Sequence, residues 1–184
     1  MSLAPADLLP GETVLGDKNA NMLIRPQDHG LAPVFSSAEA IGGKLYLTTA
    51  RLVFRAHALN RVTGTTSLFL ANVEGVRDTS RGLMRKIEVT TGRHATEFVL
   101  WGIPAFMEAI AQARSAITPE ARERLRELVL AGHPALHLGL RASATVDATV
   151  RAVMAGAKLV DLVAAPTPAA LATVGEAIDL VKRG

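Results

Sequence analysis

Cysteine is absent from this 184-residue sequence, and aromatic residues make up only 4% of it, with a single tryptophan and a single tyrosine. Without cysteine the chain forms no disulfide and carries out no thiol chemistry or cysteine-based metal binding. Once a core is filled, few aromatic side chains remain to stack on bases, which disfavours nucleic acid as a partner.

Long apolar runs are also missing. No stretch of 18 residues is free enough of charge and polarity to span a bilayer. Residues 1–10 contain no lysine or arginine and no uninterrupted apolar block, so we expect no secretory signal there. The remaining composition, 49% hydrophobic and 20% charged, is that of a globular protein. We expect a cytoplasmic protein that can associate peripherally with a membrane.

Positive charge is concentrated in the middle of the chain. Residues 51–94 hold eight arginines or lysines against three acidic residues, whereas the rest is slightly acidic. This favours an anionic partner such as phosphate, nucleic acid or a lipid surface, although a solvated basic face is the alternative. Within this region, Leu83 and Met84 could insert into a lipid surface or pack on the sheet. The candidate ligand-binding residues are Arg77, Arg81, Arg85 and Lys86.

The first half of the sequence has the two-residue periodicity of antiparallel strands. Residues 44–49 and 51–57 alternate in this way, with Leu45 and Leu47 on one face of the first strand, and a turn at Thr49 joins them into a hairpin. We expect six or seven strands before Trp101. The other candidates are residues 11–16, 21–25, 66–76, 84–91 and 95–101, the last two joined by a tight turn at Gly92.

The second half has helical periodicity. Apolar residues at spacings of three and four predict a helix over residues 104–116, with Pro104 in its first turn. A second helix begins after the capping residue Thr118 and ends at Gly132, and a loop through residues 137–139 follows. Further helical patterns lie within residues 146–164 and 171–181.

The pattern over residues 146–164 has small and branched side chains every 3.5 residues on average, which is typical of a seam that packs against another helix. The seam can serve self-association or a protein partner, or it can pack within its own chain. The candidate seam residues are Val146, Val150, Val153, Ala157 and Val160.

No motif for catalysis stands out. The sequence has neither a Gly-x-Ser-x-Gly elbow nor a phosphate-binding loop of the P-loop spacing. His133 and His137 have a spacing that zinc could use on a helix, but Pro134 disfavours helix at His133 and no carboxylate lies within five residues. We therefore expect no metal, no cofactor and no enzymatic activity.

Residues 43–54, Gly-Lys-Leu-Tyr-Leu-Thr-Thr-Ala-Arg-Leu-Val-Phe, resemble the core signature of GRAM domains, a branch of the pleckstrin-homology (PH) superfold. In that family a glycine precedes a Leu-Tyr-Leu-Thr strand, and an arginine opens a second strand of the form Leu-Val-Phe. Residues 9–12, Leu-Pro-Gly-Glu, are similar to the family's opening motif. The resemblance covers about residues 7–117.

The resemblance implies an open barrel of seven antiparallel strands, plugged at one end by a helix. It also implies an adaptor that binds lipid headgroups, membranes or proteins without catalysis. The sequence departs from members that grip polyphosphorylated inositols, because their Lys-x(n)-Arg-x-Arg pattern is replaced here by Lys18 and Arg25 alone, which make a poor phosphate clamp.

The fold class expected is therefore α+β, with a PH-like open barrel over residues 1–117 and a helical extension of about three helices over residues 118–184. The function expected is that of a non-catalytic binding module whose extension self-associates or holds a protein partner. The alternatives are peripheral binding to anionic lipid through residues 77–86 and a nucleic-acid-associated regulator.

Overall fold

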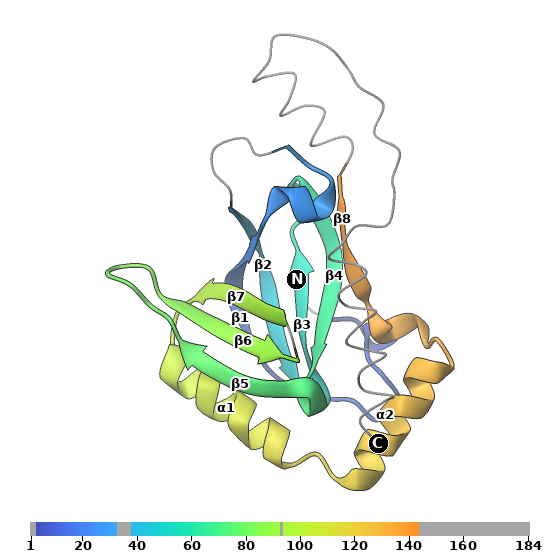
Figure 1. The fold of residues 1–184 in the computed structure, drawn as a ribbon. Helices are drawn as coiled ribbons and strands as arrows, with labels where there is room; N and C mark the ends of the chain where they lie inside the picture. The colour runs from blue at the N-terminus through green and yellow to red at the C-terminus, as the bar shows by residue number, and fades with distance from the viewer. Residues whose placement is uncertain (1–2, 33–37, 93, 144–184) are drawn as a thin grey trace.

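The computed structural model describes residues 3–32, 38–92 and 94–143, which form a curved antiparallel sheet and two α-helices (Figure 1). The strands within these residues are β1 (Val14–Ile24), β2 (Glu39–Thr48), β3 (Arg51–Ala56), β4 (Val62–Phe69), β5 (Val73–Asp78), β6 (Lys86–Thr91), β7 (His94–Leu100) and β8 (Leu138–Ala142). The helices are α1 (Ile103–Ser115) and α2 (Pro119–Leu130), with short 3₁₀ turns η1 (Pro5–Asp7), η2 (Pro26–His29), η3 (Leu70–Asn72) and η4 (Pro134–Leu136).

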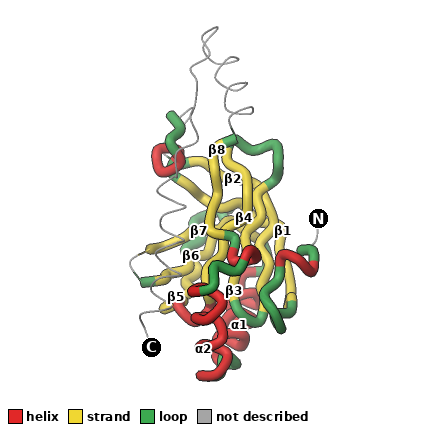
Figure 2. The backbone as a smooth tube through the Cα atoms, turned by 90° about the vertical axis from the view of Figure 1, so that its right-hand side faces the viewer, coloured by secondary structure: helices red, strands yellow, loops and turns green. Residues whose placement is uncertain are grey.

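Strand β1 holds the two halves of the sheet together. It pairs with β2 along its whole length, and its second half also pairs with β7, where Ala20 lies opposite Leu100. The strand order is β5-β6-β7-β1-β2-β3-β4-β8, so β5 and β8 are the edges. Figure 1 shows β5, β6 and β7 running across the direction of β2, β3 and β4, and Figure 2 shows both α-helices at one end of the strands. The prediction of an antiparallel sheet before Trp101 is confirmed, with seven strands there.

Inward-facing side chains of both halves meet in one apolar core. The ring centroids of Phe54 in β3 and Phe98 in β7 lie 5.8 Å apart, which joins the two halves at the centre. Helix α1 contributes Phe106 and Ile110, both buried. Other fully buried side chains of this core follow the two-residue periodicity of the strands that the sequence predicts: Leu45, Leu47, Leu52, Ile87 and Val89.

A second, smaller apolar cluster joins the N-terminal segment, the β2–β3 turn, β4, α2 and η4. Its members include Leu9, Phe69 and Leu136. Tyr46 and Val53, whose side chains point away from the main core, are buried as well. The β2–β3 hairpin is therefore covered on both faces.

Both helices begin where the sequence predicts. Helix α1 has Pro104 in its first turn and buries one stripe of apolar side chains. The Thr118 hydroxyl caps α2 by accepting a hydrogen bond of 3.1 Å from the Ala121 amide. In the part of the chain that the structure describes, no helix is long and apolar enough to cross a bilayer.

Three expectations about element boundaries are wrong. The two strands expected over residues 11–16 and 21–25 are parts of one long strand, β1 (Val14–Ile24), because it must reach both sheet halves. The predicted strand over residues 66–76 is split by η3, at which the chain passes from β4 to β5. The loop expected through residues 137–139 enters β8, which pairs with β4 and buries Leu140.

The part of the predicted helical extension that the structure describes, residues 118–143, thus contains one α-helix, a 3₁₀ turn and a strand. Strand β8 has only five residues, two of them leucines, and so short a pattern does not predict a strand. Its position is fixed by the open edge of β4, with which it pairs. The helical patterns within residues 146–164 and 171–181, with the seam from Val146 to Val160, lie outside the described residues.

Candidate functional site

Most of the basic side chains concentrated in residues 51–94 are neutralised by carboxylates. Two of the predicted ligand-binding residues are among them, since Arg77 pairs with Glu88 and the Lys86 ammonium lies 2.5 Å from Glu97 Oε1. The other ion pairs of this region are Arg51–Glu12, Arg55–Asp7 and Arg61–Glu39. The cluster of charge in the sequence therefore does not become a continuous basic face.

The other two predicted ligand-binding residues, Arg81 and Arg85, are exposed at the end of the β5–β6 hairpin. Within the described residues neither forms an ion pair. Asp78 lies at the base of the same hairpin: hydrogen bonds from the Ser80 hydroxyl and amide lower its pKa, and the charge of Arg85 adds a smaller contribution in the same direction. Arg81 and Arg85 thus leave positive charge available to an outside partner.

The loop between these strands, residues 79–85, is hydrogen-bonded up to its tip. Arg81 and Met84 exchange two backbone hydrogen bonds of 3.0 Å across a turn whose first central residue, Gly82, has φ of 56°. At the base of the loop, the Thr79 amide donates to the Lys86 carbonyl at 2.8 Å. This ladder fixes which side chains the tip presents.

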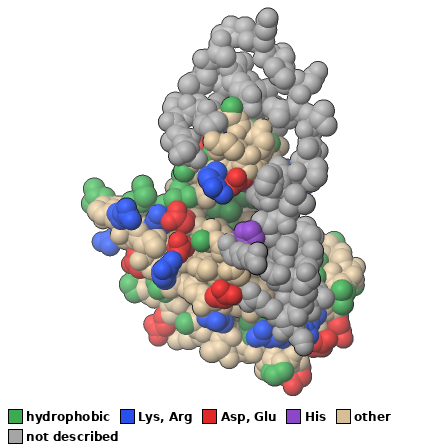
Figure 3. All heavy atoms as spheres, viewed as in Figure 1, with side chains coloured by type: hydrophobic (Ala, Val, Ile, Leu, Met, Phe, Trp, Pro, Cys, Tyr) green, Lys and Arg blue, Asp and Glu red, His purple; other side chains and the backbone are tan. Residues whose placement is uncertain are grey.

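Two apolar side chains are exposed at this tip. Leu83 is 95% exposed and Met84 is 54% exposed. The interpretation in which Leu83 and Met84 pack on the sheet is therefore wrong, because the hairpin projects away from the body of the molecule (Figure 1). Figure 3 shows hydrophobic and basic side chains together on this projection. An exposed apolar tip flanked by two unpaired cations is the most distinctive surface feature of the described residues.

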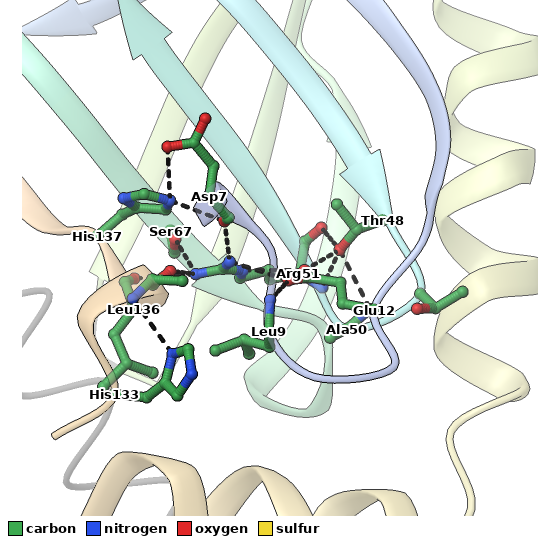
Figure 4. Close-up of polar contacts among 12 residues, drawn as sticks. Asp7, Leu9, Glu12, Thr48, Ala50, Arg51, Ser67, His133, Leu136 and His137 are labelled. Atoms are coloured by element: carbon green, nitrogen blue, oxygen red, sulfur yellow. Dashed lines mark hydrogen bonds and ion pairs between the residues drawn. The ribbon is translucent and has the colours of Figure 1, made fainter. Parts of the chain in front are cut away.

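The most densely bonded polar group lies elsewhere, around the Arg51 guanidinium (Figure 4). Arg51 is fully buried and makes a bidentate pair with Glu12, with both nitrogen–oxygen distances 2.9 Å. Its remaining donors reach the Ser67 hydroxyl and the main-chain carbonyls of Asp7, Ala135 and Leu136.

The Glu12 carboxylate is equally occupied, since it also accepts hydrogen bonds from the Leu9 amide at 2.7 Å and the Thr48 hydroxyl at 2.6 Å. This network ties the N-terminal segment and η4 to the β2–β3 hairpin. The resemblance motifs contained both Glu12 and Arg51, but sequence reasoning did not connect them. Their occurrence in two separate motifs, with opposite charges, was the available signal.

The two histidines considered as metal ligands do not share a helix face. His133 Nδ1 accepts a hydrogen bond of 3.2 Å from the Ala135 amide, and His137 Nε2 lies 2.9 Å from the Asp7 carbonyl oxygen. Burial lowers the pKa of His137, although the contact with Asp7 partly opposes this. Each imidazole serves a local turn, and the described residues hold no group of three potential ligands.

Lys18 and Arg25 both lie near β1 but are separated by seven residues, about 23 Å along an extended strand. Arg25 pairs with Asp28 at 3.1 Å on the surface, whereas Lys18 lies beside Gly102 at the end of β7. They therefore cannot grip one phosphate group together. The positions of the two residues agree with the sequence argument that they make a poor phosphate clamp.

Comparison with known proteins gives no family assignment. No protein-family model matches the chain, and no curated protein sequence matches it. Among solved structures, the N-terminal PH domain of Vps36 is similar with a TM-score of 0.44 and 18% identity, over 60% of this chain and 85% of that one. The C-terminal domain of an unknown protein from Leishmania infantum is similar with a TM-score of 0.44 and 16% identity, over 56% and 85%.

Proposed function

We propose that this chain is a non-catalytic binding module that docks on an anionic membrane surface through the loop of residues 79–85. The observation that carries the proposal is Leu83, 95% exposed at the tip of a hydrogen-bonded hairpin between the unpaired cations Arg81 and Arg85. A lipid surface offers both of the environments that this tip lacks: acidic headgroups for the arginines and hydrocarbon for the leucine.

The energetics predict weak and reversible docking. Each lysine or arginine near an acidic membrane contributes about 1 kcal/mol to the free energy of binding. Full burial of Leu83 or Met84 would contribute at most about 1.5–3 kcal/mol each, and shallow insertion gives less. A total on the order of 5 kcal/mol corresponds to an affinity near millimolar, so one hairpin does not anchor the protein by itself. Binding should weaken as salt is added, because exposed charges are screened.

The arrangement of the polar side chains supports binding over catalysis. Glu12, Arg51 and Thr48 use their hydrogen-bonding capacity on one another and on the main chain, and Arg51 is wholly removed from solvent. The groups best suited to chemistry therefore have a structural role. The surface features that remain are charge and apolar area, which suit recognition.

Co-sedimentation with lipid vesicles tests the proposal. The wild-type chain should bind vesicles of phosphatidylcholine with phosphatidylserine and should not bind vesicles of phosphatidylcholine alone. The double variant Arg81→Glu/Arg85→Glu should lose at least about tenfold in affinity, because two positive charges at the surface become negative and the local net charge falls by four units.

A control of equal net charge is Arg25→Glu/Arg124→Glu, two exposed positions away from the hairpin. It should bind nearly as the wild type does. Equal loss in both double variants would mean that only net charge matters, and unchanged binding by the hairpin variant would overturn the proposal. The proposal would also be overturned if the wild-type chain did not bind acidic vesicles.

The predicted self-association through Val146, Val150, Val153, Ala157 and Val160 concerns residues outside the described part of the chain. It stays a prediction, and light scattering after size exclusion would test it.

A further inference from the structure

The single tryptophan of the chain is placed at the surface. Trp101 is 75% exposed and lies between the end of β7 and the start of α1. In a chain with so few aromatic residues, an exposed tryptophan indicates a contact site more than a packing role, because the indole ring combines a large apolar area with one polar N–H group.

The sheet register brings Trp101 to the same end of the molecule as the hairpin tip. The Leu100 amide donates a hydrogen bond of 3.1 Å to the Arg85 carbonyl, one step beyond the last β6–β7 pair. Met84 precedes Arg85 in the chain, and Trp101 follows Leu100, so these two exposed apolar residues flank one hydrogen-bonded pair. Figure 1 also shows the hairpin and the start of α1 on the same side.

A third strand adds a cation to this end of the sheet. Leu100 pairs with Ala20 of β1, two residues after Lys18. Gly102, with φ of 73°, passes so close to Lys18 that a Cβ at this glycine would lie 3.1 Å from Nζ. The Lys18 ammonium thus lies beside Gly102, the residue that follows Trp101 in the chain. The acid that precedes Lys18, Asp17, pairs with Lys44 at 2.6 Å, so among the residues that the structure describes no carboxylate pairs with Lys18.

We propose that Trp101 and Lys18 form a second contact with the interfacial layer of an anionic bilayer, beside the loop of residues 79–85. The proposal rests on the proposed function, to which it adds a residue pair and an orientation. The indole ring lies at the boundary of headgroups and hydrocarbon, where tryptophan is favoured, and the ammonium reaches acidic headgroups. Two weak contacts on neighbouring strands fix the angle of the sheet to the membrane, which one loop cannot do.

The mixed chemistry of this surface favours a bilayer over another protein or a nucleic acid. Lys18, Arg81 and Arg85 share one end of the sheet with the exposed apolar residues Leu83, Met84 and Trp101. Within the described residues none of the three cations forms an ion pair. A bilayer interface presents anionic charge and hydrocarbon a few ångströms apart over any area. A single-stranded nucleic acid is bound by stacking its bases on aromatic side chains, and the aliphatic side chains of Leu83 and Met84 cannot take that role.

Because Trp101 is the only tryptophan, its fluorescence reports the contact directly. Adding vesicles of phosphatidylcholine with phosphatidylserine should shift its emission to shorter wavelength and should reduce its quenching by acrylamide. Vesicles of phosphatidylcholine alone should do neither. The variant Trp101→Ala should lose roughly tenfold in affinity for the acidic vesicles, and Lys18→Gln roughly fivefold.

The matched control is Leu130→Ala, which removes an exposed apolar side chain from α2, 72% exposed, and should bind as the wild type does. Far-UV circular dichroism checks that each variant folds. If the wild type binds through Arg81 and Arg85 while the Trp101 emission stays unchanged, this inference fails and the proposed function stands. If no acidic vesicle is bound at all, both fail.

Discussion

Replacing Arg51 by methionine should remove a large part of the stability of this fold. Methionine fills a similar length of side chain but has no donors, so the Glu12 carboxylate, 1% exposed, would lose both of its charged hydrogen bonds. The Ser67 hydroxyl and the carbonyls of Ala135 and Leu136 would lose a donor too.

Breaking a buried ion pair by removing one partner costs about 3–5 kcal/mol, because the remaining charge is left in an apolar environment. Unfolding free energies of single domains are typically about 5–15 kcal/mol. Arg51→Met should therefore bring the chain close to unfolding at room temperature. The double variant Glu12→Leu/Arg51→Met should lose less than the sum of the two single variants, with a coupling of about 2–3 kcal/mol, because it removes both charges.

Urea unfolding followed by far-UV circular dichroism measures these losses. Tryptophan fluorescence is less suitable, because Trp101 is already 75% exposed in the folded state. The control Arg25→Met breaks a surface pair with Asp28 and should cost less than about 1 kcal/mol. Should Arg51→Met be too unstable to purify, Arg51→Lys keeps the charge and loses the bidentate geometry. A cost for Arg51→Met no greater than that of the control would refute the reasoning.

Two further predictions concern a close approach and a buried titratable group. A Cβ at Gly43 would lie 2.4 Å from the Arg55 carbonyl and 2.6 Å from the Phe54 ring, so Gly43→Ala should cost at least about 2 kcal/mol in urea unfolding. Gly42→Ala, with no contact under 3.4 Å, should be nearly neutral, and equal costs for the two variants would contradict this. Burial lowers the pKa of His29, 2% exposed, from its ordinary value of 6.5, so the folded state binds its proton less readily than the unfolded state. Stability should then fall as the pH drops below about 6.5, by up to about 1.4 kcal/mol per pH unit from this group, and His29→Gln should flatten the decline; an unchanged slope would show that His29 is not responsible.

The parts of the fold that the sequence predicted are those governed by short-range periodicity. The β2–β3 hairpin, helix α1 and the Thr118 cap each depend on neighbouring residues, and all are found in the structure. Strand β8 and the long β1 depend on which distant edges are free to pair, and nothing local to either segment contains that information.

The same distinction applies to the candidate site. The basic segment was visible in the sequence, but the pairing of Arg77 with Glu88 and of Lys86 with Glu97 depends on cross-strand register. From the sequence, Trp101 marks only the end of the strand region. Its exposure follows from the position of β7 beside the hairpin, which is a property of the assembled sheet.

The arginine-centred network also sets the minimum length of chain that can fold. Residues about 7–117 resemble a complete module, yet two acceptors of Arg51 belong to Ala135 and Leu136, and β8 occupies the edge of β4. A chain shortened at residue 117 would leave donors without acceptors in the interior and an open strand ready to pair with a neighbouring molecule, which favours aggregation. Expression boundaries for this protein should therefore be drawn beyond Ala142.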